Sequence, residues 1–240
     1  MGTERIHHKE RFLNQIAKSL GRERIKTPVE RPVWKQQPQK EVYKGFSQDQ
    51  LVDILKKQCE NIHTQVVEVE RKESLPSELE RLTDQIGGKS IVSWDDPRFQ
   101  EYRVNQYFQK ASSKGVDVHI WDRDLGDENI HKAEKADIGI TFSDITLAES
   151  GTVVLFSDNG KGRSVSLLPT VYIAIIPKKS IVPRMTQATS YIHRMQQEEG
   201  KVPSCINFIS GPSNSADIEM DLVVGVHGPV QAYYVIVDED

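Results

Sequence analysis

From Ser47 onward, segments with a helical spacing of apolar residues alternate with short apolar runs of strand length. We expect strands at 66–69, 90–94, 116–121, 138–142, 152–156, 171–176, 204–210 and 230–237, and helices at 47–62, 76–86, 97–113, 128–135 and 184–199. This alternation predicts an α/β fold with a mostly parallel sheet and helices on both faces. The run at 152–156 follows its predecessor closely, so we expect it to add an antiparallel element.

The N-terminal segment has a different character. Residues 8–20 have the apolar spacing of an amphipathic helix, and residues 22–45 lose that periodicity and contain three prolines. We therefore divide the chain into an N-terminal helix with an extended polar arm (1–45) and an α/β domain (46–240). Trp34, Val42 and Tyr43 are apolar anchors that favour packing of the arm on the body or on a second subunit of a homo-oligomer. A disordered tail is the alternative.

Charge and hydropathy exclude several classes of function. The 240 residues carry a net charge of −4, and the lack of a basic excess argues against nucleic acid as the main partner. No apolar run approaches the roughly 20 residues that span a bilayer. The charged start, Met1–Arg11, lacks the apolar core of a signal peptide, so we expect a cytoplasmic protein.

The chain has two cysteines, Cys59 and Cys205, which lie far apart in the sequence. Two buried thiols are the simplest interpretation, and a disulfide is the alternative. A chain with two cysteines does not supply the four thiolates of a typical iron–sulfur cluster. No paired Cys or His spacing indicates zinc, so we expect no metal and no cofactor in this chain.

Three segments carry residues suited to chemistry, and the first contains Glu149 in the sequence Leu-Ala-Glu-Ser-Gly-Thr. A partly buried carboxylate before an apolar strand can act as a nucleophile or a general base, because its surroundings set its pKa. The alternative is structural: the Glu149 carboxylate pairs with a lysine or arginine, or accepts backbone N–H groups in a tight turn.

The second segment contains Lys161 and Arg163 within Asp-Asn-Gly-Lys-Gly-Arg-Ser. Backbone amides and two cations can bind a carboxylate or phosphate. The segment fails the GxGxxG pattern, because Val165 occupies the position of the third glycine, and it also lacks the end of a P-loop. A hairpin-like turn is the alternative.

The third segment, 211–229, joins two strand-like runs. Its candidate ligand-binding groups, which can donate hydrogen bonds at a helix start, are Ser213, Asn214 and Ser215. If the chain is extended there, the side chains of Asp217 and Glu219 face the same way. The two carboxylates could then bind a metal ion as a pair, or they could cap a backbone turn and pair with arginine. His227, between two glycines, is a candidate acid–base group or a structural histidine. We expect the three segments to enclose one cleft at the rim of the sheet.

These segments resemble the LUD-domain family. The resemblance rests on Leu147–Thr152, on Leu168-Pro169, on Gly211–Glu219 and on Gly225–Pro229. It extends over roughly residues 46–240 and also includes the polar arm. Where Thr is expected before Ala-Asp-Ile-Glu, this chain has Ser215, which retains the hydroxyl group.

The resemblance implies a fold similar to the sugar-phosphate isomerase, CoA-transferase and formyltetrahydrofolate cyclo-ligase group. It also implies a role in oxidising L-lactate to pyruvate beside two iron–sulfur partner proteins that hold the clusters. CoA transferases of that group use a glutamate nucleophile near a similar turn, which suggests an alternative: an acyl- or CoA-transferase-like or ligase-like enzyme that uses Glu149. In either case we expect a small carboxylate or phosphate as the ligand.

Overall fold

A computed structural model describes residues 7–30, 32–218 and 220–239 of the chain. The chain divides into two compact units, residues 1–38 and 39–240. In the first unit, helix α1 (Lys9–Ser19) ends beside Gly21, whose φ of 64° is typical of a helix stop. Arg24 folds back onto α1, where Nη2 donates to Glu10 Oε1 at 2.9 Å.

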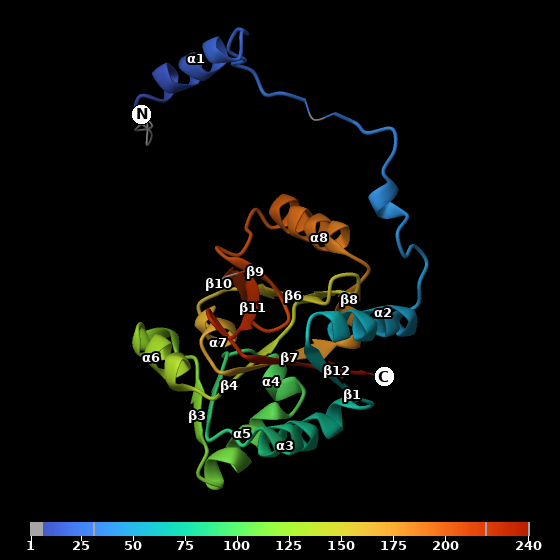
Figure 1. Cartoon of the computed structure of the whole chain (residues 1–240), viewed down its shortest axis with the longest axis vertical. Helices are drawn as coiled ribbons and strands as arrows, with labels where there is room; N and C mark the ends of the chain where they lie inside the picture. Colours follow the sequence, from blue (N-terminus) through green and yellow to red (C-terminus); the bar gives the residue numbers. More distant parts are fainter. Residues whose placement is uncertain (1–6, 31, 219, 240) are drawn as a thin grey trace. The chain divides into compact units, whose positions relative to one another are not determined.

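The second unit contains the remaining elements (Figure 1). Its helices are α2 (Gln48–Asn61), α3 (Leu75–Ile86), α4 (Arg98–Glu101), α5 (Val104–Ser113), α6 (Glu128–Lys135), α7 (Ser164–Leu167) and α8 (Met185–Glu198). Its strands are β1 (Thr64–Val69), β2 (Ser90–Ser93), β3 (Asp117–Ile120), β4 (Ile138–Phe142), β5 (Ile145–Leu147), β6 (Thr152–Phe156), β7 (Val171–Pro177), β8 (Ile181–Val182), β9 (Ile206–Ser210), β10 (Asn214–Ile218), β11 (Asp221–Val224) and β12 (Gln231–Val237). Short 3-10 turns lie at Pro38–Lys40, Lys72–Ser74, Arg123–Leu125 and Lys178–Ser180.

The main sheet has six strands in the order β1-β12-β7-β4-β2-β3, and each neighbouring pair is parallel. The predicted α/β class with a mostly parallel sheet is therefore confirmed. A second sheet, β8-β5-β6-β9, contains the expected antiparallel element, because β6 runs antiparallel to both β5 and β9. Helices α3 and α5 lie on one side of the main sheet, and the second sheet with α8 lies on the other (Figure 1).

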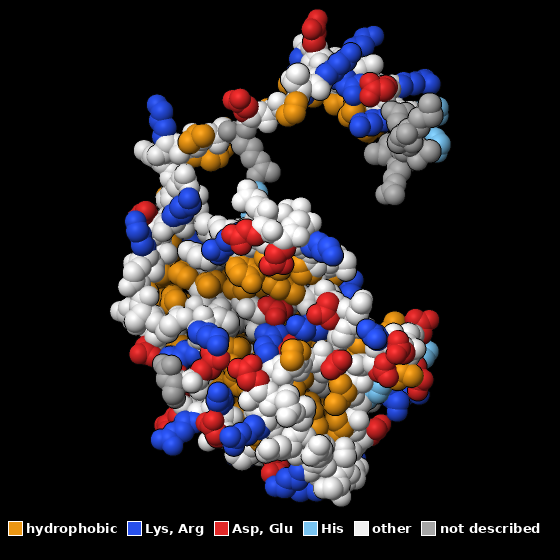
Figure 2. Space-filling view, turned by 180° about the vertical axis from the view of Figure 1, so that it is seen from behind, with side chains coloured by type: hydrophobic (Ala, Val, Ile, Leu, Met, Phe, Trp, Pro, Cys, Tyr) orange, Lys and Arg blue, Asp and Glu red, His pale blue; other side chains and the backbone are white. Residues whose placement is uncertain are grey.

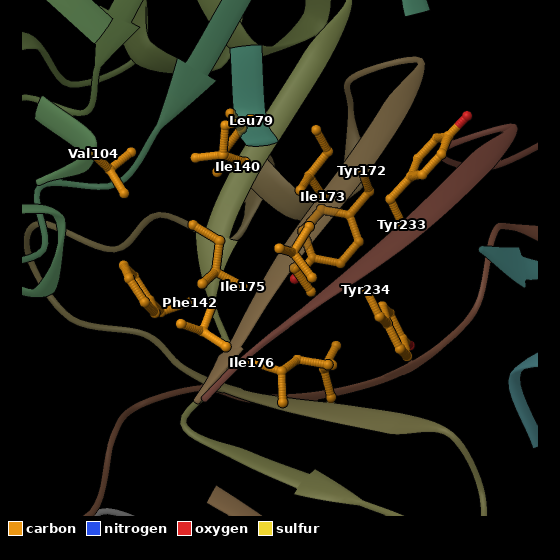
Figure 3. Packing of buried hydrophobic residues seen from close by; sticks show 14 of the residues in the cluster. Leu79, Val104, Ile140, Phe142, Tyr172, Ile173, Ile175, Ile176, Tyr233 and Tyr234 are labelled. Atoms are coloured by element: carbon orange, nitrogen blue, oxygen red, sulfur yellow. The ribbon is translucent and has the colours of Figure 1, made fainter. Parts of the chain in front are cut away.

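The core lies on both faces of the central strands. All seven residues of β7 are buried, and so are six of the seven in β12. A strand that is covered on both faces has no solvent side, so its sequence is continuously apolar rather than alternating. On the helical side, Ile140 of β4 lies beside Leu79 of α3 (Figure 3). On the other side lie Tyr172 and Tyr234, whose hydroxyl groups reach polar partners.

One predicted helix differs from the structure. Residues 97–113 form two short helices, α4 and α5, because Arg103 between them has a left-handed backbone conformation with φ of 59°. Local apolar spacing does not report such a break. The predicted capping box at the start of α2 is present, with Gln50 N donating to Ser47 Oγ at 3.2 Å.

Among the described residues, no helix combines the length and the apolar character that crossing a membrane requires.

The contact between α7 and β4 gives a stability prediction. A Cβ atom on Gly139 of β4 would lie 2.0 Å from the backbone oxygen of Val165, so Gly139→Ala must displace backbone. We expect a loss of about 1–3 kcal/mol in the free energy of unfolding, measured by urea denaturation. Gly88→Ala is the matched control, because its nearest contact is the flexible end of the Ile138 side chain at 2.6 Å. Equal losses in the two variants would contradict this packing.

Candidate functional site

An open groove of about 320 Å³ lies where the loop after β9 meets the loop before β12. It brings together three of the predicted site residues, Ser213, Asn214 and His227. Other elements contribute Ser166 of α7 and Tyr172 of β7. The remaining lining residues are Leu167, Phe208, Ile209, Ser210, Gly211, Pro212, Gly228 and Pro229.

Ser213 organises the backbone of this groove. Its N–H donates to Pro229 O at 2.8 Å, and its carbonyl accepts from Gly225 N at 2.8 Å. Its hydroxyl oxygen accepts from the backbone N–H of His227 at 3.3 Å. These bonds tie the two loops together and leave the His227 side chain exposed at the groove.

The segment after Ser213 is extended, so the expected helix start there is wrong. Asn214 begins β10, and its Nδ2 donates to Pro212 O at 3.4 Å. Ser215 lies outside the groove lining, and its hydroxyl donates to Asp217 Oδ2 at 3.0 Å. Glu219 lies outside the described residues, so the predicted pairing of Asp217 with Glu219 stays a prediction.

The Tyr234 hydroxyl joins the groove to the glutamate turn. It donates to Gly151 O at 2.9 Å and accepts from Gly211 N at 3.2 Å, and the Tyr234 side chain is fully buried. Beside this contact, Thr152 Oγ1 lies 2.7 Å from Ser210 Oγ. Segments that are about 60 residues apart in the sequence are therefore neighbours.

Both turns require glycine. Gly151 and Gly211 have φ of 62° and 71°, a region that L side chains rarely adopt. A Cβ atom on Gly211 would lie 2.4 Å from the carbonyl oxygen of Ile62, and one on Gly151 would lie 2.6 Å from the Cδ1 atom of the same residue. The two turns therefore pack against the end of α2, where the carbonyl oxygen of Ile62 excludes a side chain at Gly211 and the positive φ favours glycine at Gly151.

Glu149 is in a turn after β5, and its carboxylate pairs with Arg184 at 2.9 Å from Oε2 to Nε. Its backbone N–H donates to Pro183 O at 3.0 Å. The ion pair with an arginine is the structural alternative that the sequence left open. Glu149 is not among the residues that line the groove, although its turn is attached to the groove through Tyr234.

The predicted cations lie in different surroundings. Lys161 Nζ lies 3.2 Å from Asp96 Oδ2, away from the groove lining. Arg163 is exposed at the start of α7, and its carbonyl accepts from Ser166, a groove residue, at 3.0 Å. The turn predicted at Asp-Asn-Gly is present, because Lys161 N donates to Asp158 O at 3.2 Å and Gly160 N donates to Asp158 Oδ1 at 2.8 Å, but it connects β6 to α7 rather than to a second strand. The proposed ligand-binding roles of these residues stay predictions.

A second polar cluster lies at the carboxyl edge of the main sheet. We did not predict a site there from the sequence. Arg98 Nε donates to both carboxylate oxygens of Asp96 at 3.0 Å, and Arg98 Nη2 donates to Asp144 Oδ1 at 2.8 Å. Asp144 Oδ2 also accepts from Phe156 N at 2.7 Å. Asp96 and Asp144 follow β2 and β4, so the sequence indicated this cluster by two carboxylates that come shortly after two apolar strands.

The topology explains why this cluster lies where ligands often bind. The main sheet continues from β2 to β3 in one direction and from β4 to β7 in the other. The space between the carboxyl ends of β2 and β4 is therefore a topological switch point, the usual ligand position in open α/β sheets. A hollow of about 650 Å³ opens nearby and includes Trp121, Asp122 and Asp158.

Burial affects the two carboxylates of the cluster differently. For Asp96, burial favours the neutral form, but hydrogen bonds and charge from Arg98 outweigh it and lower the pKa. For Asp144, burial dominates over the attraction of Arg98 and raises the pKa. The cluster therefore holds one carboxylate firmly ionised and one that protonates more readily.

Neither cysteine is in the groove. Cys59 is fully buried, and burial raises the pKa of its thiol to about 12, so it is inert at neutral pH. Both cysteines are free thiols, so the alternative of a disulfide is wrong. Within the part of the chain that the structure describes, no group of three or more His, Cys, Asp or Glu is placed to hold a metal ion.

Comparison with known proteins assigns the family. The LUD domain matches residues 52–237, and the chain belongs to the LUD-domain family. It is similar to the Lactate utilization protein C of Geobacillus sp. (strain WCH70), with 56% identity over 100% of this chain and 99% of that protein. It is also similar to the Lactate utilization protein C of Bacillus subtilis (strain 168), with 54% identity over 98% of each chain.

A solved structure shares the fold. The crystal structure of a DUF162 family protein from Deinococcus radiodurans superposes with a TM-score of 0.55. The match covers 80% of this chain and 99% of the other, at 18% identity. At that identity the similarity supports the fold alone.

The Tyr234 contact gives a direct test. Tyr234→Phe removes the partner of two buried backbone groups, so we expect a loss of about 1–3 kcal/mol in unfolding free energy. Amide hydrogen exchange at Gly211 should accelerate as well. Tyr233→Phe is the matched control, because the Tyr233 hydroxyl bonds to the side chains of Gln65 and Gln231 and not to the backbone of the two turns. A loss as large in the control, or unchanged exchange at Gly211, would count against the link.

The carboxylate cluster gives a pH prediction with opposite signs at its two members. The lowered pKa of Asp96 stabilises the fold above the ordinary value of 3.8, and this contribution is lost as pH falls below it. The raised pKa of Asp144 stabilises the fold below the ordinary value of 3.8. This stabilisation is lost as the pH rises through the pKa of Asp144 in the folded protein. Relative to the parent, Asp96→Asn should therefore become more destabilising as pH rises, and Asp144→Asn less destabilising. Unfolding free energies measured between pH 3 and 7 check this, and parallel profiles would contradict it.

Proposed function

We propose that this chain is a cytoplasmic component of L-lactate utilization that acts with two iron–sulfur proteins in the oxidation of L-lactate to pyruvate. The single observation that carries the proposal is its similarity, along the full length, to relatives named Lactate utilization protein C. The similarity includes the N-terminal unit as well as the α/β unit, so it is not limited to a shared fold.

The thiol content supports a subunit that holds no cluster of its own. The chain has two cysteines, and the thiol of Cys59 is buried with a raised pKa. An iron–sulfur cluster typically needs four thiolate ligands. Electrons from lactate would therefore leave through the partner proteins, and this chain would bind a substrate, a product or a partner.

We assign ligand binding to the groove at Ser213 and His227. Its polar groups come from three elements: Asn214 of β10, Ser166 of α7 and the exposed His227. A small carboxylate suits this set, because hydroxyl, amide and imidazole N–H groups donate hydrogen bonds to an anion. Arg163, one helical turn before Ser166, would add a positive charge at the rim.

Complementation tests the proposal. In Bacillus subtilis, the gene for the resident Lactate utilization protein C would be deleted and this chain expressed in its place. We expect growth on L-lactate as sole carbon source to return, while growth on glucose stays unchanged throughout. His227→Ala should lower lactate oxidation by about a hundredfold if the imidazole transfers a proton. His193→Ala, an exposed histidine of α8, is the matched control.

Two results would contradict the proposal. The first is a parent chain that is folded and expressed but does not restore growth. The second is a purified mixture with the two iron–sulfur proteins that shows neither association nor any change in lactate-dependent dye reduction.

A second candidate function is an acyl- or CoA-transferase-like or ligase-like enzyme that uses Glu149. The observation that favours it is the position of this side chain, which is 36% exposed at a turn held by buried contacts. The same growth assay separates the candidates: Glu149→Gln should abolish growth if the carboxylate reacts. Growth equal to the parent would remove Glu149 chemistry from consideration.

A further inference from the structure

Charge is divided unequally between the two units of the chain. Residues 1–38 carry nine Lys or Arg and four Asp or Glu, a net charge of +5. Residues 39–240 carry 22 and 31, a net charge of −9. The overall value of −4 hides this division, and two units of opposite sign attract each other when they belong to different molecules.

The N-terminal unit is also apolar on its surface. Its exposed large side chains are Phe12, Ile16, Leu20, Ile25, Val29, Val33 and Trp34. Phe12 and Ile16 of α1 lie at helical spacing with Leu20, which caps the helix, and Lys9, Arg11 and Lys18 are the basic residues of the same helix. Figure 2 shows Lys and Arg side chains around exposed hydrophobic ones at the helical end of this unit. A basic helix with an uncovered apolar stripe is typical of a binding element.

The α/β unit carries an acidic surface with exposed apolar side chains, which complements the basic, apolar surface of the N-terminal unit. Strands β10 and β11 form a two-stranded hairpin outside the two larger sheets. Leu222 and Val224 lie two residues apart on β11, so they share a face, and they are 58% and 42% exposed. Asp217 and Asp221 on the same hairpin are exposed and acidic.

We propose that the N-terminal unit of one copy binds the β10–β11 hairpin of a second copy, and that the exchange is reciprocal. The apolar stripe of α1 would cover Leu222 and Val224. Lys9, Arg11 and Lys18 would be attracted to the negative charge of the hairpin at Asp217 and at Asp221, which alternates to the face opposite Leu222. Each copy offers one basic helix and one acidic hairpin, so a two-fold dimer forms both contacts at once.

The length of the connecting segment allows this arrangement. Residues 20–37 separate α1 from the 3-10 turn at Pro38–Lys40, and the described residues among them, 20–30 and 32–37, contain no helix or strand. Eighteen extended residues span up to about 60 Å, so α1 can reach a neighbouring molecule. Two linked contacts per dimer also strengthen each other, because the second forms within the complex. The inference is independent of the proposed lactate function.

The experiment uses two charge-reversed versions of the full chain. The first carries Lys9→Glu, Arg11→Glu and Lys18→Glu, and the second carries Asp217→Lys and Asp221→Lys. Sedimentation equilibrium should give a dimer for the parent and at least tenfold weaker association for each variant alone. Mixing the two variants should restore a dimer, because the reversed helix then faces the reversed hairpin and the two unchanged elements face each other. Circular dichroism would check that both variants are folded.

A control variant tests whether total charge alone matters. The control also reverses three exposed basic residues, but outside the N-terminal unit: Lys57→Glu, Lys135→Glu and Lys201→Glu. It should dimerise like the parent. Leu222→Ser with Val224→Ser should weaken the dimer without any change in charge.

Several results would overturn the inference. A parent chain that is monomeric at all concentrations would do so, whether its N-terminal unit binds its own body or vesicles of anionic phospholipid. A mixture of the two variants that stays monomeric, or variants that dimerise as tightly as the parent, would do so equally. Binding of the N-terminal unit only to the iron–sulfur partners would assign the surface to another protein.

Discussion

The hydroxyl group of the fully buried Tyr234 connects the two larger sheets of this protein at the point where its candidate site forms. Tyr234 lies on β12, and its hydroxyl bonds to Gly151 and Gly211, which belong to turns at the ends of β6 and β9. An amide and a carbonyl that are buried without partners would destabilise the fold, so one hydroxyl fixes both turns. The contact of Tyr234 with the two turns therefore fixes the position of the groove at Ser213 and of the turn that contains Glu149.

Two polar centres result, and they have different characters. The groove contains hydroxyl, amide and imidazole groups and has an exposed histidine. The cluster of Asp96, Arg98 and Asp144 is largely paired within itself and lies at the switch point of the sheet. The first suits a small ligand that needs hydrogen-bond donors, and the second orders the loops after β2 and β4.

Much of the fold could be predicted from the sequence, because its signals are local. The continuous apolar runs of β7 and β12 indicate strands buried on both faces, and helix α6 has the predicted bounds 128–135. The break at Arg103 could not be predicted, since a single left-handed residue leaves no periodic trace. The extended conformation after Ser213 was also missed, because turn-forming residues allow a helix start as readily as a hairpin.

The site was harder to predict than the fold because its contacts are distant in the sequence. The pairing of Glu149 with Arg184 spans 35 positions, and the contact of Lys161 with Asp96 spans 65. Apolar spacing and turn chemistry identify which segments carry polar groups, but they do not determine which of those groups meet. The groove therefore retains Ser213, Asn214 and His227 from the expected single cleft. Arg163 bonds to the groove residue Ser166 without lining the groove, and Lys161 lies at Asp96.

The most direct test of ligand binding in the groove is a titration of the isotopically labelled chain with L-lactate, followed through its backbone amide resonances. We expect saturable shifts at Gly211, Ser213, Asn214 and His227, with smaller changes at Gly151 across the Tyr234 contact. Shifts confined to Asp96, Asp144 and Lys161, or no shifts at millimolar lactate, would contradict it.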